Sequence, residues 1–303
     1  MKVLITGASG LVGTALVSAL ATEGHTVCRL VRPESTGPRV RTAVDVPWNP
    51  ATGELGSAAS GADAVVNLAG ASIASGRWTE ARKQVLVASR VDTTRALVGM
   101  FAKMKVRPRV LVSASGAGYY GWRGDELLTE ESAAGNDFLA RMAVDWEAEA
   151  RKAEGLGIRV VLLRFGLILA KHGGGLPRVM LPFRFGLGGR VGSGNQWLPW
   201  STLDDAVGMI RFVITNENLT GPVNAVAPRP VKNAEFTRTL AAVMHRPAIF
   251  PVPAFVLRMA LGEMADALAL GSQRAVPQKL EQSGYRYQHR DLESALRAVL
   301  GNG

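Results

Sequence analysis

Short apolar runs alternate with longer segments of helical periodicity along the first half of the chain. Lys2–Thr6 carries Val, Leu and Ile in succession, a run typical of a strand buried on both faces. From Leu11 to Leu20 apolar residues recur about four positions apart, as on one face of a helix, and Gly24 is a natural helix end. A second strand is predicted at Thr26–Arg32, so the chain opens with a strand, a turn, a helix and a strand.

The alternation continues beyond this unit. Apolar strand-like runs occupy residues 64–67, 109–113 and 158–164, and helical periodicity occupies residues 79–104 and 137–154 between them. Repeated crossovers of this kind predict a parallel sheet with helices on both faces. The sequence therefore predicts an α/β fold with a Rossmann-like, doubly wound parallel sheet.

The pattern changes after residue 165. Residues 170–200 are rich in glycine and aromatic residues, which is typical of a lid or binding loop. From Asn233 onward the periodicity is mainly helical, with a short strand predicted at Tyr285–Tyr287. We therefore expect a sheet domain at residues 1–230 and a smaller, mainly helical C-terminal lobe at residues 231–303, packed on the substrate side.

Three glycines follow the first predicted strand with the spacing G-x-x-G-x-x-G. In a strand–turn–helix unit the first allows a tight turn, the second lets the backbone approach a pyrophosphate, and the third lets the helix pack on the sheet. The helix N-terminus then offers free N–H groups to that anion. We predict a dinucleotide site there, with contacts from Gly7, Ser9, Gly10, Leu11, Val12 and Gly13.

The end of the second predicted strand indicates which dinucleotide is bound. The carboxylate that would bind an adenosine ribose 2′-OH is missing, and Arg32 stands in its place. A guanidinium can pair with a 2′-phosphate, with help from Ser35 or Arg39, so NADP(H) is favoured over NAD. The alternative is that Arg32 is an ordinary solvated arginine.

The composition limits the class of protein. The chain has 303 residues, of which 47% are hydrophobic, with one cysteine and a formal net charge of +10. No segment approaches the ~20 apolar residues of a membrane helix, and a single cysteine forms no internal disulfide. We expect a cytoplasmic globular protein with no membrane partner. The basic residues are scattered, which argues against a nucleic-acid partner, and no metal-ligand spacing occurs.

Several motifs together resemble a known family. The glycine turn, Asn67-Leu68-Ala69-Gly70 and Ser113-Ala114-Ser115 look like the extended and atypical short-chain dehydrogenase/reductases of the NAD-dependent epimerase/dehydratase fold. More narrowly, motifs along nearly the whole chain resemble a subgroup labelled "epimerase family protein", which has its own C-terminal module at about 250–300. The resemblance implies binding of NADPH. It adds Leu68, Ala69, Gly70 and Arg90 to the predicted cofactor contacts.

The chain departs from that family at the expected reaction centre. Reductases of the superfamily use a Tyr-x-x-x-Lys pair to exchange a proton while hydride moves. Alignment on Glu147 puts Leu139 and Ala143 in those places, and a one-residue shift puts Phe138 and Met142 there. None of these side chains transfers a proton. Arg90 likewise falls where the relay asparagine is expected.

Other groups are therefore candidates for catalysis. Ser115, Tyr119 and Tyr120 follow the predicted strand at residues 109–113, at the sheet edge where such folds place substrates. We favour Ser115 over Ser113 as a polar contact. A tyrosine near Arg90 or Arg164 would have a lowered pKa, although a hydrogen-bonding or stacking role for it is as well supported. His172 is the one histidine expected near the pocket.

The long glycine-rich segment holds a second set of polar residues. Their types suit an anionic or aromatic substrate, and the alternative that the arginines face water is equally supported. The residues are Arg178, Arg184, Arg190, Gln196, Trp197 and Trp200.

Three functions follow from these features. The first is an NADP(H)-binding oxidoreductase or nucleotide-sugar-epimerase-like enzyme acting on a small, anionic substrate. The second is a catalytically degenerate NADPH-binding sensor or regulator. The third, a nucleic-acid-associated protein, is supported only by the net charge. The sequence sets no oligomeric state.

Overall fold

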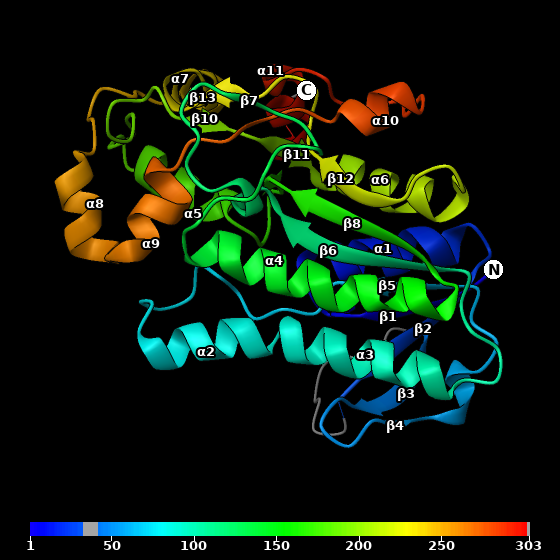
Figure 1. The fold of residues 1–303 in the computed structure, drawn as a ribbon. Helices are drawn as coiled ribbons and strands as arrows, with labels where there is room; N and C mark the ends of the chain where they lie inside the picture. The colour runs from blue at the N-terminus through cyan, green and yellow to red at the C-terminus, as the bar shows by residue number, and fades with distance from the viewer. Residues whose placement is uncertain (33–41, 302–303) are drawn as a thin grey trace.

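The computed structural model describes residues 1–32 and 42–301 and contains a central eight-stranded sheet (Figure 1). The strand order is β12-β8-β6-β5-β1-β2-β3-β4, and all neighbours are parallel except β3 and β4. The strands are β1 (Lys2–Thr6), β2 (Thr26–Val31), β3 (Val44–Asn49), β4 (Glu54–Leu55), β5 (Ala64–Asn67), β6 (Val110–Gly116), β8 (Arg159–Phe165) and β12 (Gly221–Ala225). The predicted doubly wound sheet is confirmed.

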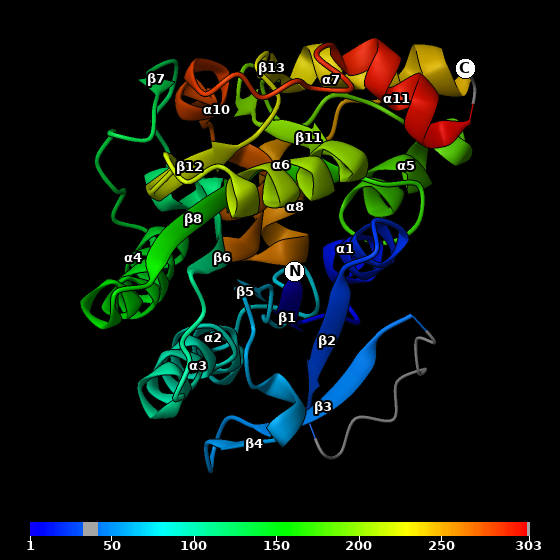
Figure 2. The ribbon, with the colours of Figure 1, turned by 90° about the vertical axis from the view of Figure 1, so that its right-hand side faces the viewer.

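Alternate residues of the strands pack on opposite faces of the sheet. Val3 and Ile5 of β1 pack with α1 (Leu11–Thr22) and α6 (Leu203–Thr215), whereas Leu4 packs with α3 (Val91–Lys103) and α4 (Phe138–Arg151). Figure 2 shows these helices on the two sides of the sheet. Both faces of each central strand are thus buried, which explains the unbroken apolar runs.

The prediction of a single helix at residues 79–104 is wrong. The structure has α2 (Glu80–Ala88) and α3, with a break at Ser89 and Arg90. In a continuous helix the Arg90 N–H would donate to the Leu86 carbonyl. Here the Arg90 N–H donates to the Val87 carbonyl, and the Arg90 guanidinium donates to the Leu86 carbonyl instead. The inward turn of the Arg90 side chain therefore ends the α2 ladder.

Residues 170–200, which the sequence predicts to be a loop, also contain α5 (Leu176–Arg184) and β10 (Trp197–Leu198). Leu176, Met180 and Phe183 are buried in a second core, which has the spacing of one helix face. This core also includes α7 (Asn233–Met244) and α11 (Leu292–Leu300). The division at residues 230 and 231 stays a prediction, although this shared core spans it. Two short pairs lie here: β9 (Leu167–Leu169) with β11 (Trp200–Thr202), and β10 with β13 (Val231–Lys232).

The C-terminal lobe lies beyond the carboxyl ends of the strands (Figure 1). Its remaining elements are α8 (Ala254–Leu261), α9 (Glu263–Ala265), β14 (Arg274–Ala275) and α10 (Gln278–Gln282), and β14 pairs with β7 (Leu127–Leu128). None of the helices in the described ranges combines the length and apolar character needed to cross a bilayer.

The strand predicted at Tyr285–Tyr287 is absent from the described structure, because this segment is held by side chains instead. The Tyr285 hydroxyl donates to the carbonyl of Asp205, and the Gln288 and His289 N–H groups donate to the Asp205 carboxylate. Asp205 is buried at the start of α6. One buried carboxylate thus fastens the C-terminal segment to the sheet domain.

Candidate cofactor and substrate site

The glycine turn after β1 has the backbone geometry that its spacing predicts. Gly7 has φ +65°, and a methyl group there would overlap the carbonyl group of Leu68. A methyl group at Gly13 would overlap the carbonyl oxygen of Gly7, so α1 packs directly on the turn. The conformational roles of Gly7 and Gly13 are confirmed. Their contact with a cofactor stays a prediction.

The N-terminus of α1 is accessible. Gly10 is the N-cap residue and has no side chain that caps the first turn. Ser9 and Gly10 are exposed, and Leu11 and Val12 are partly exposed. The first-turn N–H groups and the positive end of the helix dipole therefore face a surface that suits an anion. The turn and the helix start fit a pyrophosphate on these grounds.

A cavity of about 550 Å³ lies beside the turn. The turn and α1 form one wall, and residues 172–174 form part of the other. Gly173 and Gly174 lie against Leu11, since methyl groups on them would come within 3.3 and 3.0 Å of its side chain. The structure thus places His172 across from the glycine turn. The lining residues are Ser9, Gly10, Leu11, Thr14, Ala15, Ser18, His172, Gly173, Gly174 and Leu203.

Arg32 follows the end of β2 with an exposed side chain. β2 is the parallel neighbour of β1, so Arg32 and the glycine turn stand at the same carboxyl edge. This is where the predicted pairing with a 2′-phosphate requires it. Ser35 and Arg39, named as its helpers, lie outside the described residues.

Asn67, at the end of β5, is a structural residue. Its side chain is fully buried, accepts a hydrogen bond from Thr6 at 2.7 Å, and donates to Thr94 at 2.8 Å and Ser113 at 3.2 Å. Asn67 therefore joins β1, β5, β6 and α3. The residues after it, Leu68, Ala69 and Gly70, leave the strand beside the glycine turn.

Arg90 lies over Gly70. A methyl group on Gly70 would come within 3.1 Å of the guanidinium, which donates to the carbonyls of Leu86 and Ala71. Of the three buried arginines, Arg90 is the one with no carboxylate partner among the described residues. Burial, with a smaller contribution from the charge of Arg82, lowers the pKa of Arg90 to about 10. Its Nε atom is buried without a hydrogen-bond partner in the described structure.

An apolar cluster fills the places of the expected Tyr-x-x-x-Lys pair. Leu139 and Met142 are buried there with Leu86, and Phe138 packs against them. Ala143 is also buried. Under either alignment, the two positions of α4 that should carry the proton relay hold side chains that exchange no proton. The cluster also includes Ala71, Ile73, Trp78, Val87 and Ala267.

Ser115 is bound to a buried ion pair. Its hydroxyl donates to Glu147 Oε1 at 2.7 Å, and Arg164 holds both oxygens of Glu147 at 2.8 Å. Burial lowers the pKa of Arg164, but the hydrogen bonds and charge of Glu147 outweigh it and raise that pKa above its ordinary value. The proton of Ser115 is therefore directed toward Glu147. The Ser115 hydroxyl can act toward a ligand only as a hydrogen-bond acceptor.

The two tyrosines pack around the same guanidinium. Arg164 lies 3.4 Å from the ring centroid of Tyr119, and its Nη1 donates to the Tyr120 hydroxyl at 3.0 Å. The lowered pKa expected for a tyrosine near Arg164 is wrong for Tyr120, because burial raises the pKa of Tyr120 to about 12. Tyr120 is fully buried, and its hydroxyl also lies 2.7 Å from Asn224 Oδ1. Its contacts make it a positioning residue rather than a proton donor.

This buried network reaches the C-terminal lobe. Asn224 donates to the carbonyl of Val276 at 2.9 Å, and the buried Glu130 carboxylate accepts from the backbone N–H groups of Asn224 and Lys279. Burial raises the pKa of Glu130. Sequence reasoning missed the Glu147–Arg164 pair and Glu130. Glu147, on which the sequence of this helix is aligned with the family, is the signal that points to this helix turn.

The second polar set does not converge on one site. Trp200 is buried in the second core, and Trp197 donates to Asp125 at 2.5 Å. Gln196 donates to the carbonyls of Val191 and Ala269, so its amide is structural. Arg178, Arg184 and Arg190 are exposed. In the described ranges no group of three or more His, Cys, Asp or Glu could hold a metal ion.

Two family models match the chain. The model of the NAD dependent epimerase/dehydratase family matches residues 3–226, and a domain of unknown function, DUF1731, matches residues 252–299. The chain belongs to the NAD dependent epimerase/dehydratase family. The resemblance in the sequence, including the subgroup's C-terminal module, is therefore confirmed.

Relatives within this epimerase family match almost the whole chain. Epimerase family protein YfhF of Bacillus subtilis is 39% identical over 303 residues, which are 100% of this chain and 99% of that protein. Epimerase family protein Mb2239 of Mycobacterium bovis is 42% identical over 295 residues, 97% of this chain and 96% of its own. The crystal structure of human epimerase family protein SDR39U1 (isoform2) with NADPH has a TM-score of 0.90 and 33% identity, covering 100% of both chains.

The close approach at Gly7 predicts a large effect of one methyl group. Gly7→Ala places a side chain at positive φ against the Leu68 carbonyl, whereas Gly24→Ala has the same strain at φ +78° in open space. We expect Gly24→Ala to lower the free energy of unfolding by about 1–2 kcal/mol, the cost of a left-handed residue, and Gly7→Ala to lower it further. Urea denaturation measures both, and equal losses would contradict the packing argument.

The Glu147–Arg164 pair gives a second prediction. Glu147→Gln leaves Arg164 buried without its charge partner, and breaking a buried pair costs about 3–5 kcal/mol. Glu293→Gln breaks the exposed pair with Arg297 at four residues' spacing and should cost under ~1 kcal/mol. Urea denaturation of the two variants at neutral pH measures the difference. A loss at Glu147 as small as that at Glu293 would show that water reaches Arg164.

Proposed function

We propose that this protein binds NADP(H) along the carboxyl edge of β1, β2 and β5 and transfers hydride between it and a small, anionic substrate. The observation that carries the proposal is the glycine turn. Gly7 and Gly13 allow a tight turn and a close approach of α1 that a methyl group would prevent, and they place an uncapped helix start at the surface. The human relative that was crystallised with NADPH, at 33% identity over both whole chains, supports the same cofactor class.

The choice of NADP(H) over NAD(H) depends on charge. A carboxylate after β2 would repel a 2′-phosphate, and Arg32 attracts one through charge-assisted hydrogen bonds. The single cysteine, Cys28, is buried and free, which agrees with the cytoplasmic location expected from the sequence. When bound, the cofactor supplies or accepts the hydride.

The remaining chemistry is assigned to residues of this chain. Ser115, whose proton is directed to Glu147, accepts a hydrogen bond from the cofactor or substrate. Arg90, which has no carboxylate partner in the described structure, stabilises the negative charge that hydride transfer leaves on the substrate oxygen beside Gly70, and water supplies the proton that completes the reduction. Tyr119 and Tyr120 hold Arg164, and Tyr119 keeps the role of a stacking residue near the site.

The apolar cluster at Leu139 and Met142 favours a second function. A site that lacks a proton-transferring pair and is filled there by buried side chains suits a protein that binds NADPH without turning it over. Such a protein reports the redox state of the cofactor pool to a partner. The two functions share the cofactor site and differ in whether hydride leaves it.

Cofactor selectivity is tested by thermal unfolding. We expect NADPH to raise the Tm clearly more than NADH does, because at equal concentration the cofactor with the lower Kd stabilises the folded protein more. A ligand at 100 times its Kd stabilises by about 2.7 kcal/mol. Arg32→Ser should remove much of this difference, because a hydrogen bond to a charged group contributes roughly 1.5–3 kcal/mol. Arg107→Ser, at an exposed site after α3, is the matched control. Equal shifts with the two cofactors would contradict the role of Arg32.

Hydride transfer is tested with NADPH deuterated at the nicotinamide C4 carbon and a library of small carbonyl compounds bearing a carboxylate or phosphate. Mass spectrometry should find deuterium in a product, and Ser115→Ala should slow its appearance by up to about tenfold, the effect of losing one hydrogen bond of roughly 0.5–1.5 kcal/mol. Ser113→Ala, buried against Asn67, controls for altered packing. NADPH binding without transfer to any compound would favour the sensor over the enzyme.

A further inference from the structure

Large apolar side chains stand exposed on α5, on α8, and on the segments that follow α5 and precede α8. Phe185 is 73% exposed, Ile249 71%, Met259 67% and Phe255 65%. Leu181 and Leu187 are also exposed. We call these six residues the apolar face. Exposed apolar residues are common singly, but a group of this size marks a binding surface.

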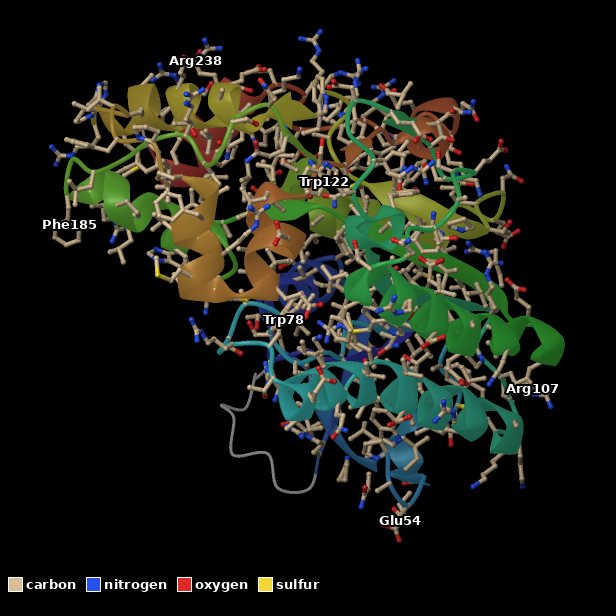
Figure 3. All side chains as sticks on the ribbon, turned by 60° about the vertical axis from the view of Figure 1, so that its left-hand side comes forward. Glu54, Trp78, Arg107, Trp122, Phe185 and Arg238 are labelled. Carbon is tan, nitrogen blue, oxygen red and sulfur yellow. The ribbon has the colours of Figure 1, made fainter. Side chains whose placement is uncertain are left out.

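The six residues come from segments that lie side by side. The Phe250 N–H donates to the Gly188 carbonyl at 3.0 Å, and the Val252 N–H donates to the Arg190 carbonyl at 2.8 Å. This pairing brings the turn after α5 against the segment that leads into α8. Figure 3 shows Phe185 pointing outward on the same side as α8.

α8 has no partner for most of its apolar surface. None of its eight residues is buried. Phe255 and Met259 are four positions apart and form one outward stripe. A helix of this composition gains little from folding onto the lobe alone, so its exposed stripe is suited to a surface outside the chain.

The charge around the apolar face is mostly positive. The exposed Glu235 and Glu263 flank the second of two segments, and these segments, at residues 176–191 and 236–262, contain six arginines and no aspartate or glutamate. Of these, Arg258 pairs with Asp266, which lies outside both segments. The arginines are Arg178, Arg184, Arg190, Arg238, Arg246 and Arg258.

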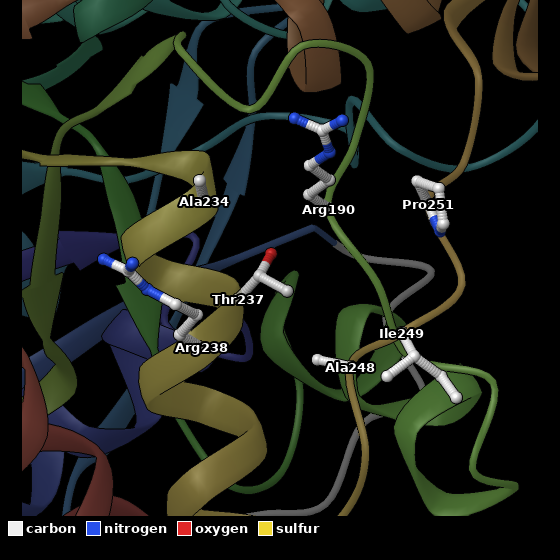
Figure 4. A pocket seen from close by; sticks show the side chains of 7 residues that line it. All are labelled: Arg190, Ala234, Thr237, Arg238, Ala248, Ile249 and Pro251. Atoms are coloured by element: carbon white, nitrogen blue, oxygen red, sulfur yellow. The ribbon is translucent and has the colours of Figure 1, made fainter.

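A cavity of about 330 Å³ adjoins the apolar face. Figure 4 shows the guanidinium groups of Arg190 and Arg238 pointing away from each other, and Arg190 donates to the Ser193 carbonyl. Ala248, Ile249 and Pro251 form the apolar wall. The two arginines add positive charge beside an apolar wall, which suits a surface that carries phosphates over an apolar interior.

We propose that the apolar face and the arginines around it dock the protein on the surface of an anionic lipid bilayer. The exposed arginines attract headgroup phosphates, and Phe185, Phe255 and Met259 enter the boundary between headgroups and acyl chains. The expectation of no membrane partner rested on the lack of a spanning segment, which does not bear on peripheral contact. A second copy is a poorer occupant, because pairing two such faces would bring arginine against arginine. The inference does not rest on hydride transfer.

Vesicle sedimentation of the full-length protein tests the inference. We expect binding to vesicles of equal parts phosphatidylcholine and phosphatidylglycerol, little binding to pure phosphatidylcholine, and release by high salt. Replacing Phe185, Phe255 and Met259 together with Ser should lower partitioning by more than roughly tenfold, from the lost apolar area. Arg190→Gln with Arg238→Gln should lower it roughly fivefold for each arginine removed.

Matched variants on other surfaces provide the controls. Trp122→Ser removes a large apolar side chain that is 60% exposed and does not belong to the apolar face. Arg107→Gln with Arg109→Gln removes two exposed arginines outside the two arginine-rich segments. These variants should bind vesicles as the unaltered chain does. Failure to bind the anionic vesicles at low salt would overturn the proposal. So would a dimer in analytical ultracentrifugation that the triple Ser variant dissociates, because a second copy would then cover the face.

Discussion

The guanidinium of Arg164 is the buried charge on which the carboxyl edge of the sheet depends. It is 2% exposed and meets Glu147 through two hydrogen bonds, Tyr120 through a third and the ring of Tyr119 at 3.4 Å. Because an unpaired charge in this position is costly, each neighbour is held in a single arrangement. The Tyr120 hydroxyl is also hydrogen-bonded to Asn224, and the Asn224 amide donates to the Val276 carbonyl in the C-terminal lobe.

The same constraint shapes the chemistry at the cleft. Glu147 engages the proton of Ser115, and the Tyr120 hydroxyl is enclosed, so neither offers a free proton to a ligand. Leu139 and Met142 are buried at positions of α4 where the usual proton relay would lie. Among the buried arginines of the described structure, Arg90 is then the one without a carboxylate partner. The chemistry that we propose for these residues is therefore charge stabilisation rather than proton exchange, for an enzyme and for a sensor alike.

What the sequence predicted correctly depends on contacts between near neighbours. The strand–turn–helix order and the roles of Gly7 and Gly13 follow from residues within one short unit, so periodicity and spacing were sufficient. At the break before α3, the Arg90 guanidinium that bonds the Leu86 carbonyl also bonds the carbonyl of Ala71, nineteen residues earlier in the chain. The burial of Tyr120 depends on Asn224, 104 residues away. Such partners become visible only when the sheet brings them together, and one local pattern does not distinguish a buried tyrosine from a reactive one.

The net charge of +10 divides into local sets with different consequences. Arg164 is neutralised inside the protein by Glu147, whereas Arg32 and Arg90 stand near the glycine turn with no carboxylate that neutralises them in the described structure. The arginines at residues 176–191 and 236–262 surround the apolar face instead, and the cavity there shares no lining residue with the cavity beside the glycine turn. Since these sets lie on separate elements, a change in one leaves the other in place. A phosphate-bearing cofactor and an anionic surface can therefore be recognised independently by one basic chain.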